Sequence, residues 1–158
     1  MANAVIDYLK AVDAELRRGC ATEHSYRPAL KDLIESLGTG LAAVNEPKRS
    51  ECGAPDFLVS KRKLPLGYIE AKDVGVDLNA VERSAQMKRY LPALENLILT
   101  NYLEFRWYVN GEIRQVAQAG RQLSYDDLAH YQRIVVALQE TGRIMGEIDG
   151  VIGKWPVG

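Results

Sequence analysis

Apolar residues recur at helical spacing in several stretches of the chain. In the first stretch four apolar side chains fall on one stripe, Val5, Leu9, Val12 and Leu16. The same spacing predicts helices over 3–18, 26–37, 78–91 and 124–140. Asp77 or Asn79 is expected to cap the third helix. The start of the second is open, because Pro28 should lie within the first turn of a helix that contains it.

Shorter runs with β-like alternation predict strands over 56–60, 66–72, 96–100, 104–109 and 112–117. The polar segment Lys61-Arg62-Lys63 separates the first two runs, which predicts a hairpin. Asn110-Gly111 is a strong tight-turn signal between the last two. The order of elements therefore predicts a mixed α/β or α+β fold, in which helices flank a small central mixed sheet.

Length and composition are those of one globular domain. The chain has 158 residues, of which 47% are hydrophobic and 26% charged. No apolar run approaches the ~20 residues that cross a bilayer, and the N-terminus does not resemble a secretory signal. Cys20 and Cys52 form neither a disulfide framework nor a zinc motif, so we expect reduced thiols in a cytoplasmic protein. We expect the domain to occupy residues 1–150, and 151–158 to be a tail, a linker or the truncation point of a larger protein.

The formal net charge of -1 is unusual for a protein that binds nucleic acid by itself. Contacts to phosphates supply most of the affinity of such proteins, and these contacts require basic residues. The charge argues against an autonomous DNA-binding module. It is compatible with a catalytic domain that is held on DNA by other domains or partners.

The predicted hairpin gathers the residues that carry chemistry. If it is centred on Lys63, Asp56 lies opposite Glu70, and Lys72 projects on the same face as Glu70. The second face then carries four apolar residues, Phe57, Val59, Ile69 and Ala71. One register therefore gathers the charges and also creates a side that faces the core.

Two carboxylates this close repel each other unless a cation lies between them or one is protonated. A divalent metal with oxygen ligands resolves the repulsion, and Mg²⁺ prefers one or two carboxylates, waters and phosphate oxygens. Lys72 would then approach the water that attacks phosphorus. The alternative is a solvated hairpin with a surface ion pair.

Other residues extend this pattern. Glu23 precedes the second helix, where it is either a site residue or an acid favoured by the helix dipole. Gln86 and Tyr90 are four residues apart and face one side of a helix, where they are either site residues or solvated polar side chains. Basic residues that would follow a phosphate backbone, or form a solvated face, are Lys48, Arg49, Lys61, Arg62, Lys63, Arg83, Lys88 and Arg89. For the aromatic residues Tyr102, Phe105, Trp107 and Tyr108, packing is expected rather than base stacking.

Asp56, the Glu70-Ala71-Lys72 triplet, Glu23 and the Gln86–Tyr90 pair together resemble the PD-(D/E)XK nuclease superfamily in its RecB-like form. The runs TEHSYRPALKDLIESL, NEPKRSECGAPDFLV, GYIEAKDVGVDLN and NLILTNYLEFRWYVNGE look like the N-terminal nuclease domain of single-chain restriction–modification enzymes. Those enzymes fuse the nuclease to an adenine methyltransferase and a specificity region, some with a helicase between. The resemblance covers roughly residues 20–117.

The resemblance implies a restriction-endonuclease-like core and a Mg²⁺ site, with Mn²⁺ expected to substitute. Asp56 and Glu70 would bind the metal, with the Ala71 carbonyl as a further ligand. Glu23 would reach the metal directly or through water, and Lys72 would position or activate the attacking water. Gln86 and Tyr90 would order the site and contact the strand.

The expected function is a Mg²⁺-dependent DNA endonuclease, the cleavage module of a restriction–modification enzyme. Its expected partners are double-stranded DNA and the methyltransferase and specificity domains, with a helicase in some enzymes. A transient dimer on DNA is also expected, since cutting both strands needs two active sites or two binding events. The alternatives are a free-standing repair or phage-defence nuclease and a catalytically inactive DNA-binding relative.

Overall fold

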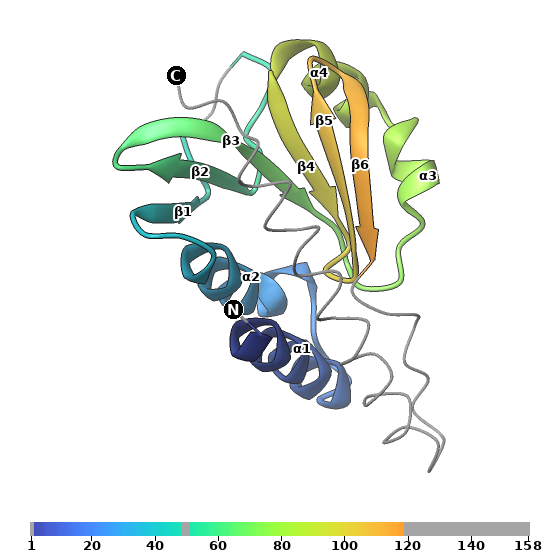
Figure 1. The fold of residues 1–158 in the computed structure, drawn as a ribbon. Helices are drawn as coiled ribbons and strands as arrows, with labels where there is room; N and C mark the ends of the chain where they lie inside the picture. The colour runs from blue at the N-terminus through green and yellow to red at the C-terminus, as the bar shows by residue number, and fades with distance from the viewer. Residues whose placement is uncertain (1, 49–50, 119–158) are drawn as a thin grey trace.

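The computed structural model describes residues 2–48 and 51–118. The predicted helix over 124–140, the domain boundary at 150 and Arg49 lie outside the described residues. The elements, shown in Figure 1, are α1 (Ala2–Arg17), α2 (Glu23–Ser36), β1 (Leu41–Asn45), β2 (Phe57–Lys61), β3 (Leu64–Ala71), α3 (Leu78–Glu82), α4 (Ala85–Ala93), β4 (Asn96–Thr100), β5 (Glu104–Val109) and β6 (Glu112–Gln118). None of the helices in these two ranges is both long and apolar enough to cross a membrane.

The strands form one six-stranded sheet whose spatial order follows the chain, from β1 to β6. Neighbouring strands are antiparallel except for β3 and β4, which are parallel. The chain crosses between these two strands through α3 and α4, as a parallel pair requires. The carboxyl ends of β3 and β4 consequently lie together, and the amide of Lys72 donates to the Thr100 carbonyl at 2.8 Å.

Helices cover both faces of the sheet. On one face α1 and α2 pack over a core that includes Leu30, Phe57 and Ile98. On the other face α3 and α4 cover a smaller cluster that includes Met87 and Leu99. Figure 1 shows α1 and α2 side by side beneath the sheet, away from α3. The predicted mixed sheet with flanking helices is therefore confirmed.

The β2–β3 hairpin has the predicted register where it matters for the site. Phe57 pairs with Ile69 and Val59 with Gly67, the alignment centred on Lys63. The four residues predicted on the apolar face are all buried, Phe57, Val59, Ile69 and Ala71. A bulge between Val59 and Ser60 shifts the pairing by one residue toward the tip. The chain turns there through Arg62 and Lys63, both with positive φ.

Other local signals also correspond to the structure. The side chain of Asp77 caps α3 by accepting from the Asn79 amide at 2.9 Å. Asn110 and Gly111 both have positive φ, and the flanking residues Val109 and Glu112 are paired. This is the tight turn that the sequence predicts between β5 and β6.

The main differences from the prediction concern two helices and one strand, and several other element ends shift by one or two residues. The helix predicted over 78–91 is divided into α3 and α4, because Ser84 caps a new helix by accepting from the Met87 amide at 3.2 Å. Helix α2 begins at Glu23, so Pro28 lies inside it and removes one backbone hydrogen bond. Strand β1 was not predicted; only Ala43 among its five residues is buried, while Leu41 is partly buried and Val44 is half-exposed.

Candidate active site

Asp56, Glu70 and Lys72 meet at the carboxyl end of β3. Asp56 is the residue before β2, and one further step of the hairpin register places it opposite Glu70. Oδ2 of Asp56 accepts from the Ala71 amide at 2.8 Å, which fixes the carboxylate against β3. Nζ of Lys72 donates to Oε1 of Glu70 at 2.6 Å. The structure thus brings together the three residues that the sequence grouped.

Gln86 and Tyr90 extend this group from α4. Oε1 of Gln86 accepts from Lys72 Nζ at 2.9 Å, and Nε2 of Gln86 donates to Glu70 Oε1 at 2.9 Å. Nε2 also lies 3.4 Å from the Tyr90 hydroxyl, one helical turn further on. Ser84 caps α4 two residues before Gln86, so the Gln86 side chain projects from the first turn of the helix and its amide contacts Glu70.

Glu70 is an unusual carboxyl group. The residue is only 3% exposed, and its Oε2 atom is buried with no hydrogen-bond partner among the described residues. Burial, followed by the nearby Asp56 carboxylate, raises the pKa of Glu70, while the Lys72 and Gln86 contacts partly oppose this. A buried acceptor without a donor, beside a second carboxylate, is the environment that a cation would satisfy. The donor set therefore fits a hard divalent metal.

Arg27 also belongs to this site, although it was not predicted from the sequence. It projects from α2 with a side chain only 6% exposed, and its guanidinium group forms an ion pair with Asp56. The same group donates to Glu46 Oε1 at 3.0 Å and to Asn45 Oδ1 at 3.2 Å. The i, i+4 spacing of Glu23 and Arg27 was the available signal.

Glu23 lies beside this arginine. Its Oε1 is 3.5 Å from Arg27, and its carbonyl accepts from the Tyr102 hydroxyl at 2.5 Å. The part of the chain that the structure describes contains no group of three or more His, Cys, Asp or Glu side chains that could hold a metal. Glu23 is linked to Asp56 through their shared ion-pair partner Arg27. The role of Glu23 as a metal ligand stays a prediction.

The loop before Asp56 fits closely against Tyr90. Gly53 has φ of +129°, and a Cβ atom there would lie 3.0 Å from Tyr90 Cε1 and 3.1 Å from its hydroxyl. Burial raises the pKa of Tyr90, so its hydroxyl stays protonated. Gly53 thus permits the close contact between the loop and the ring.

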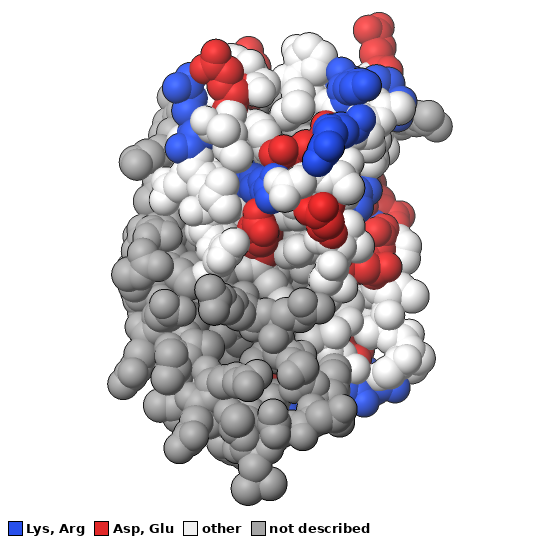
Figure 2. All heavy atoms as spheres, turned by 90° about the vertical axis from the view of Figure 1, so that its right-hand side faces the viewer, with Lys and Arg blue, Asp and Glu red and all other residues white. Residues whose placement is uncertain are grey.

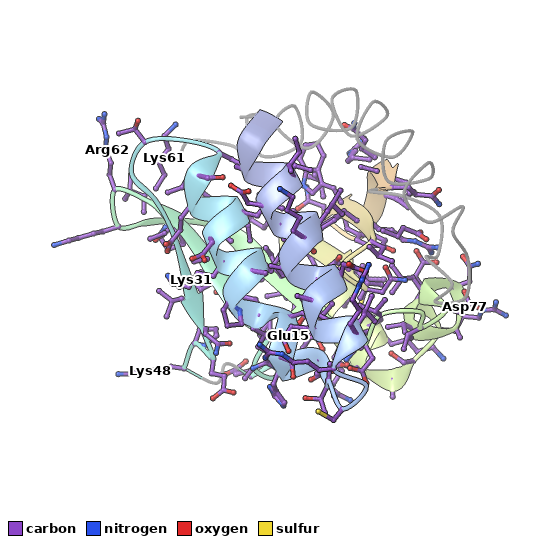
Figure 3. All side chains as sticks on the ribbon, turned by 90° about the horizontal axis from the view of Figure 1, so that it is seen from below. Glu15, Lys31, Lys48, Lys61, Arg62 and Asp77 are labelled. Atoms are coloured by element: carbon purple, nitrogen blue, oxygen red, sulfur yellow. The ribbon has the colours of Figure 1, made fainter. Side chains whose placement is uncertain are left out.

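The basic residues are spread over the surface. Figure 3 shows Lys61 and Arg62 projecting from the tip of the β2–β3 hairpin, with Lys48 and Lys31 toward the same side of the molecule. On the face in Figure 2, lysine and arginine are interspersed with aspartate and glutamate over the described part. This mixture agrees with the near-neutral charge of the chain. Whether these residues follow a phosphate backbone stays a prediction.

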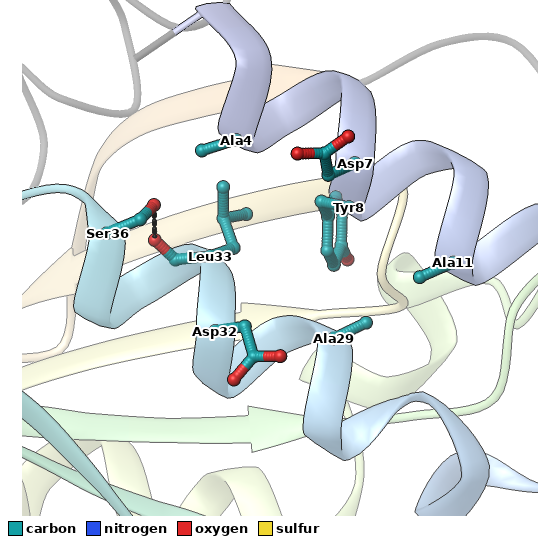
Figure 4. Close-up of a pocket in the computed structure, with 8 residues that line it drawn as sticks. All are labelled: Ala4, Asp7, Tyr8, Ala11, Ala29, Asp32, Leu33 and Ser36. Atoms are coloured by element: carbon teal, nitrogen blue, oxygen red, sulfur yellow. Dashed lines mark hydrogen bonds between the residues drawn. The ribbon is translucent and has the colours of Figure 1, made fainter.

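Three of the four aromatic residues singled out in the sequence are buried, Tyr102, Trp107 and Tyr108. Phe105 is partly buried and packs against the same core and the Tyr8 ring, so the expectation that these residues pack is confirmed for all four. A groove of ≈ 300 Å³ lies between α1 and α2, lined by Asp7, Asp32, Tyr8, Leu33 and small residues (Figure 4). None of the residues grouped around Glu70 lines this groove.

Comparison with known proteins gives structural matches alone. No protein family and no curated protein matches the chain. Seven chains of solved structures match, among them one in the cryo-electron microscopy structure of a DrdV–DNA complex, with a TM-score of 0.71 and 19% identity. The match covers 98% of this chain and 14% of that chain. Similarity at this level establishes the fold, and it confirms the predicted class: the chain has the mixed α/β fold of one segment of a chain in the DrdV–DNA complex.

Proposed function

We propose that this chain is a metal-dependent DNA endonuclease domain of the PD-(D/E)XK class. The observation that carries the proposal is the meeting of Asp56, Glu70 and Lys72 at one strand end, with the Oε2 atom of Glu70 buried and unpartnered among the described residues. Paired carboxylates with an adjacent ammonium group are suited to hydrolysis of a phosphodiester bond.

The expected metal is Mg²⁺, with Mn²⁺ as a substitute. Asp56 and Glu70 would hold it together with the Ala71 carbonyl, and Glu23 would contribute directly or through water. The bound metal would polarise the scissile phosphate and lower the pKa of a coordinated water. The chain's own contribution is to hold two carboxylates in a water-poor setting, where their attraction for a cation is strong.

Lys72 is suited to orienting the attacking water. An ammonium group has three N–H donors, and two of them are engaged by Glu70 and Gln86. These contacts fix the nitrogen in place and leave one donor for a water molecule. Gln86 bridges Lys72 and Glu70, and Tyr90 supports Gln86, so both residues order the site as the resemblance implies.

The proposed substrate is duplex DNA, cut as the cleavage module of a restriction–modification enzyme. The likeness to part of a chain in a DrdV–DNA complex supports this proposal. The near-neutral charge of the domain also supports partners that supply the hold on DNA, namely methyltransferase and specificity domains, with a helicase in some enzymes. A transient dimer on DNA would bring the two sites that double-strand cutting requires.

The test is cleavage of supercoiled plasmid by the purified chain in Mg²⁺ and in Mn²⁺. Asp56→Ala, Glu70→Ala and Lys72→Ala should each abolish cutting while circular dichroism shows that the variants remain folded. Asp32→Ala and Lys10→Ala, which change exposed residues of α2 and α1, are matched controls and should cut like the parent chain. Normal cutting by all three site variants would refute the proposal.

A second candidate is a DNA-binding relative that does not cut. It is favoured by the two contacts of Asp56, since Arg27 and the Ala71 amide already supply donors to both carboxylate oxygens. Calorimetric titration with Mn²⁺ separates the two candidates. Binding heat that disappears in Asp56→Asn argues for the nuclease, and absence of heat in the parent chain argues for the inactive relative.

A further inference from the structure

One guanidinium group lies among three carboxylates beside the proposed metal site. Arg27 forms ion pairs with Glu23, Glu46 and Asp56, so this cluster has one positive and three negative charges. We propose that Arg27 is a resident cation that holds Asp56 in position and competes electrostatically with the divalent metal. This inference rests on the proposed function and concerns the regulation of the same site.

The surroundings of Arg27 indicate that charge determines its position. Its Nε atom is buried and has no hydrogen-bond partner among the described residues. Leaving a buried donor unsatisfied costs free energy, so contacts elsewhere on the guanidinium group must compensate for it. Those contacts are the carboxylates and the Asn45 amide oxygen, on the two terminal nitrogens.

The helix that carries Arg27 is anchored where it begins. The Tyr102 hydroxyl donates to the Glu23 carbonyl at 2.5 Å, and the Tyr8 hydroxyl donates to the Tyr102 carbonyl at 2.6 Å. The rings of Tyr26 and Tyr102 pack with centroids 5.0 Å apart. The start of α2 is thus tied to the loop after β4 and to α1. Arg27 therefore approaches Asp56 from a fixed base, and its charge stays next to that carboxylate.

Two opposing consequences follow for metal binding. Arg27 offsets the repulsion between the carboxylates, so the site keeps its shape without metal. The same positive charge repels a divalent cation that binds Asp56, and it occupies one lone pair of that carboxylate. Arg27 therefore lowers metal affinity in exchange for a site that is already assembled.

The test measures Ca²⁺ and Mn²⁺ affinity by calorimetry on the full chain, without DNA. Arg27→Gln removes the charge and should bind each metal about tenfold more tightly or better, whereas Arg27→Lys keeps the charge and should stay within about threefold of the parent. Lys31→Gln removes a charge one helical turn further along α2, where Lys31 contacts Glu35 and the Ala43 carbonyl, and should bind like the parent. Equal or weaker binding by Arg27→Gln, or equal changes in Arg27→Gln and Arg27→Lys, would overturn the inference.

Thermal unfolding provides a second readout. Without metal Arg27→Gln should melt below the parent, and saturating Ca²⁺ should raise its melting temperature more than it raises that of the parent. If Arg27 had a merely structural role, Arg27→Gln would lower the melting temperature equally without metal and with saturating Ca²⁺. That result would contradict the proposal.

A surface variant covers the case in which Arg27→Gln does not fold. The Glu46 side chain is 72% exposed, so Glu46→Gln should fold normally. It leaves Arg27 shared by fewer anions, and we expect metal affinity to fall about two- to threefold. Unchanged affinity would overturn the inference. If the parent chain binds no divalent metal, the proposed function fails together with this inference; if the parent binds and only the variant predictions fail, the proposed function stands.

Discussion

Asp56→Asn should destabilise the metal-free fold as well as remove a proposed metal ligand. In the native chain Oδ1 of Asp56 accepts from Arg27 and Oδ2 accepts from the Ala71 amide. Asparagine has a single side-chain carbonyl oxygen, so its NH₂ group must face one of these two donors. The substitution therefore removes the ion pair. It also places the asparagine NH₂ group against another hydrogen-bond donor, where neither group can accept.

The size of the effect follows from burial. Removing one partner of a buried ion pair typically costs about 3–5 kcal/mol, because the other charge is left buried without compensation. Here the side chains of Arg27 and Asp56 are 6% and 13% exposed, and Arg27 keeps its contacts with Glu46 and Glu23. We therefore expect a loss of about 2–3 kcal/mol in the free energy of unfolding, below the full value.

Urea unfolding in EDTA, followed by circular dichroism, measures this loss for Asp56→Asn, Arg27→Gln and the double variant. The two substitutions should couple by at least about 1 kcal/mol, because the second removes a partner that is already lost. Asp32→Asn, at an exposed residue of α2, is the control and should change little. Additivity of the two single variants within about 0.5 kcal/mol would refute the reasoning.

The remaining predictions concern Glu70, Gly53 and Phe57. Because the pKa of Glu70 is raised in the folded state, its contribution to stability is present below the unfolded value of 4.5 and is lost as pH rises through the folded pKa. Without metal, the free energy of unfolding of Glu70→Gln should therefore increase relative to that of the parent as pH rises through the folded pKa. Urea unfolding at several pH values measures this, and a difference between the two proteins that does not change with pH would contradict it. Gly53→Ala should destabilise the fold because the added Cβ atom collides with Tyr90. Its cost should exceed that of Gly19→Ala by about 1–3 kcal/mol, since a Cβ at Gly19 meets nothing within 4 Å. Equal losses in the two variants would argue against the contact between Gly53 and Tyr90. Phe57→Ala, in the fully buried face of the hairpin, should cost about 3–5 kcal/mol, against little for Val44→Ala at a half-exposed position of β1, and a small loss would mean that this face does not carry the core.

The hairpin and its charged residues could be predicted from the sequence because the rules involved are local. Side chains alternate along a strand, so the apolar set Phe57, Val59, Ile69 and Ala71 admits one register with a buried face. That register places Glu70 with Lys72 and brings Asp56 opposite. The turn between β5 and β6 could be predicted for a similar local reason, since Asn110 and Gly111 both tolerate positive φ.

Contacts between distant segments were decided by the tertiary structure alone. Arg27 and Asp56 are separated by 29 positions in the chain, and no local pattern relates a helix residue to a strand end across that distance. The same holds for β1, whose five residues are placed by pairing with β2, and for Gln86, which reaches Glu70 because Ser84 starts a new helix. Sequence periodicity determines which face of an element is apolar, whereas packing determines which elements meet. The residues that carry charge into this site were therefore visible in the sequence, but the guanidinium group that balances them was not.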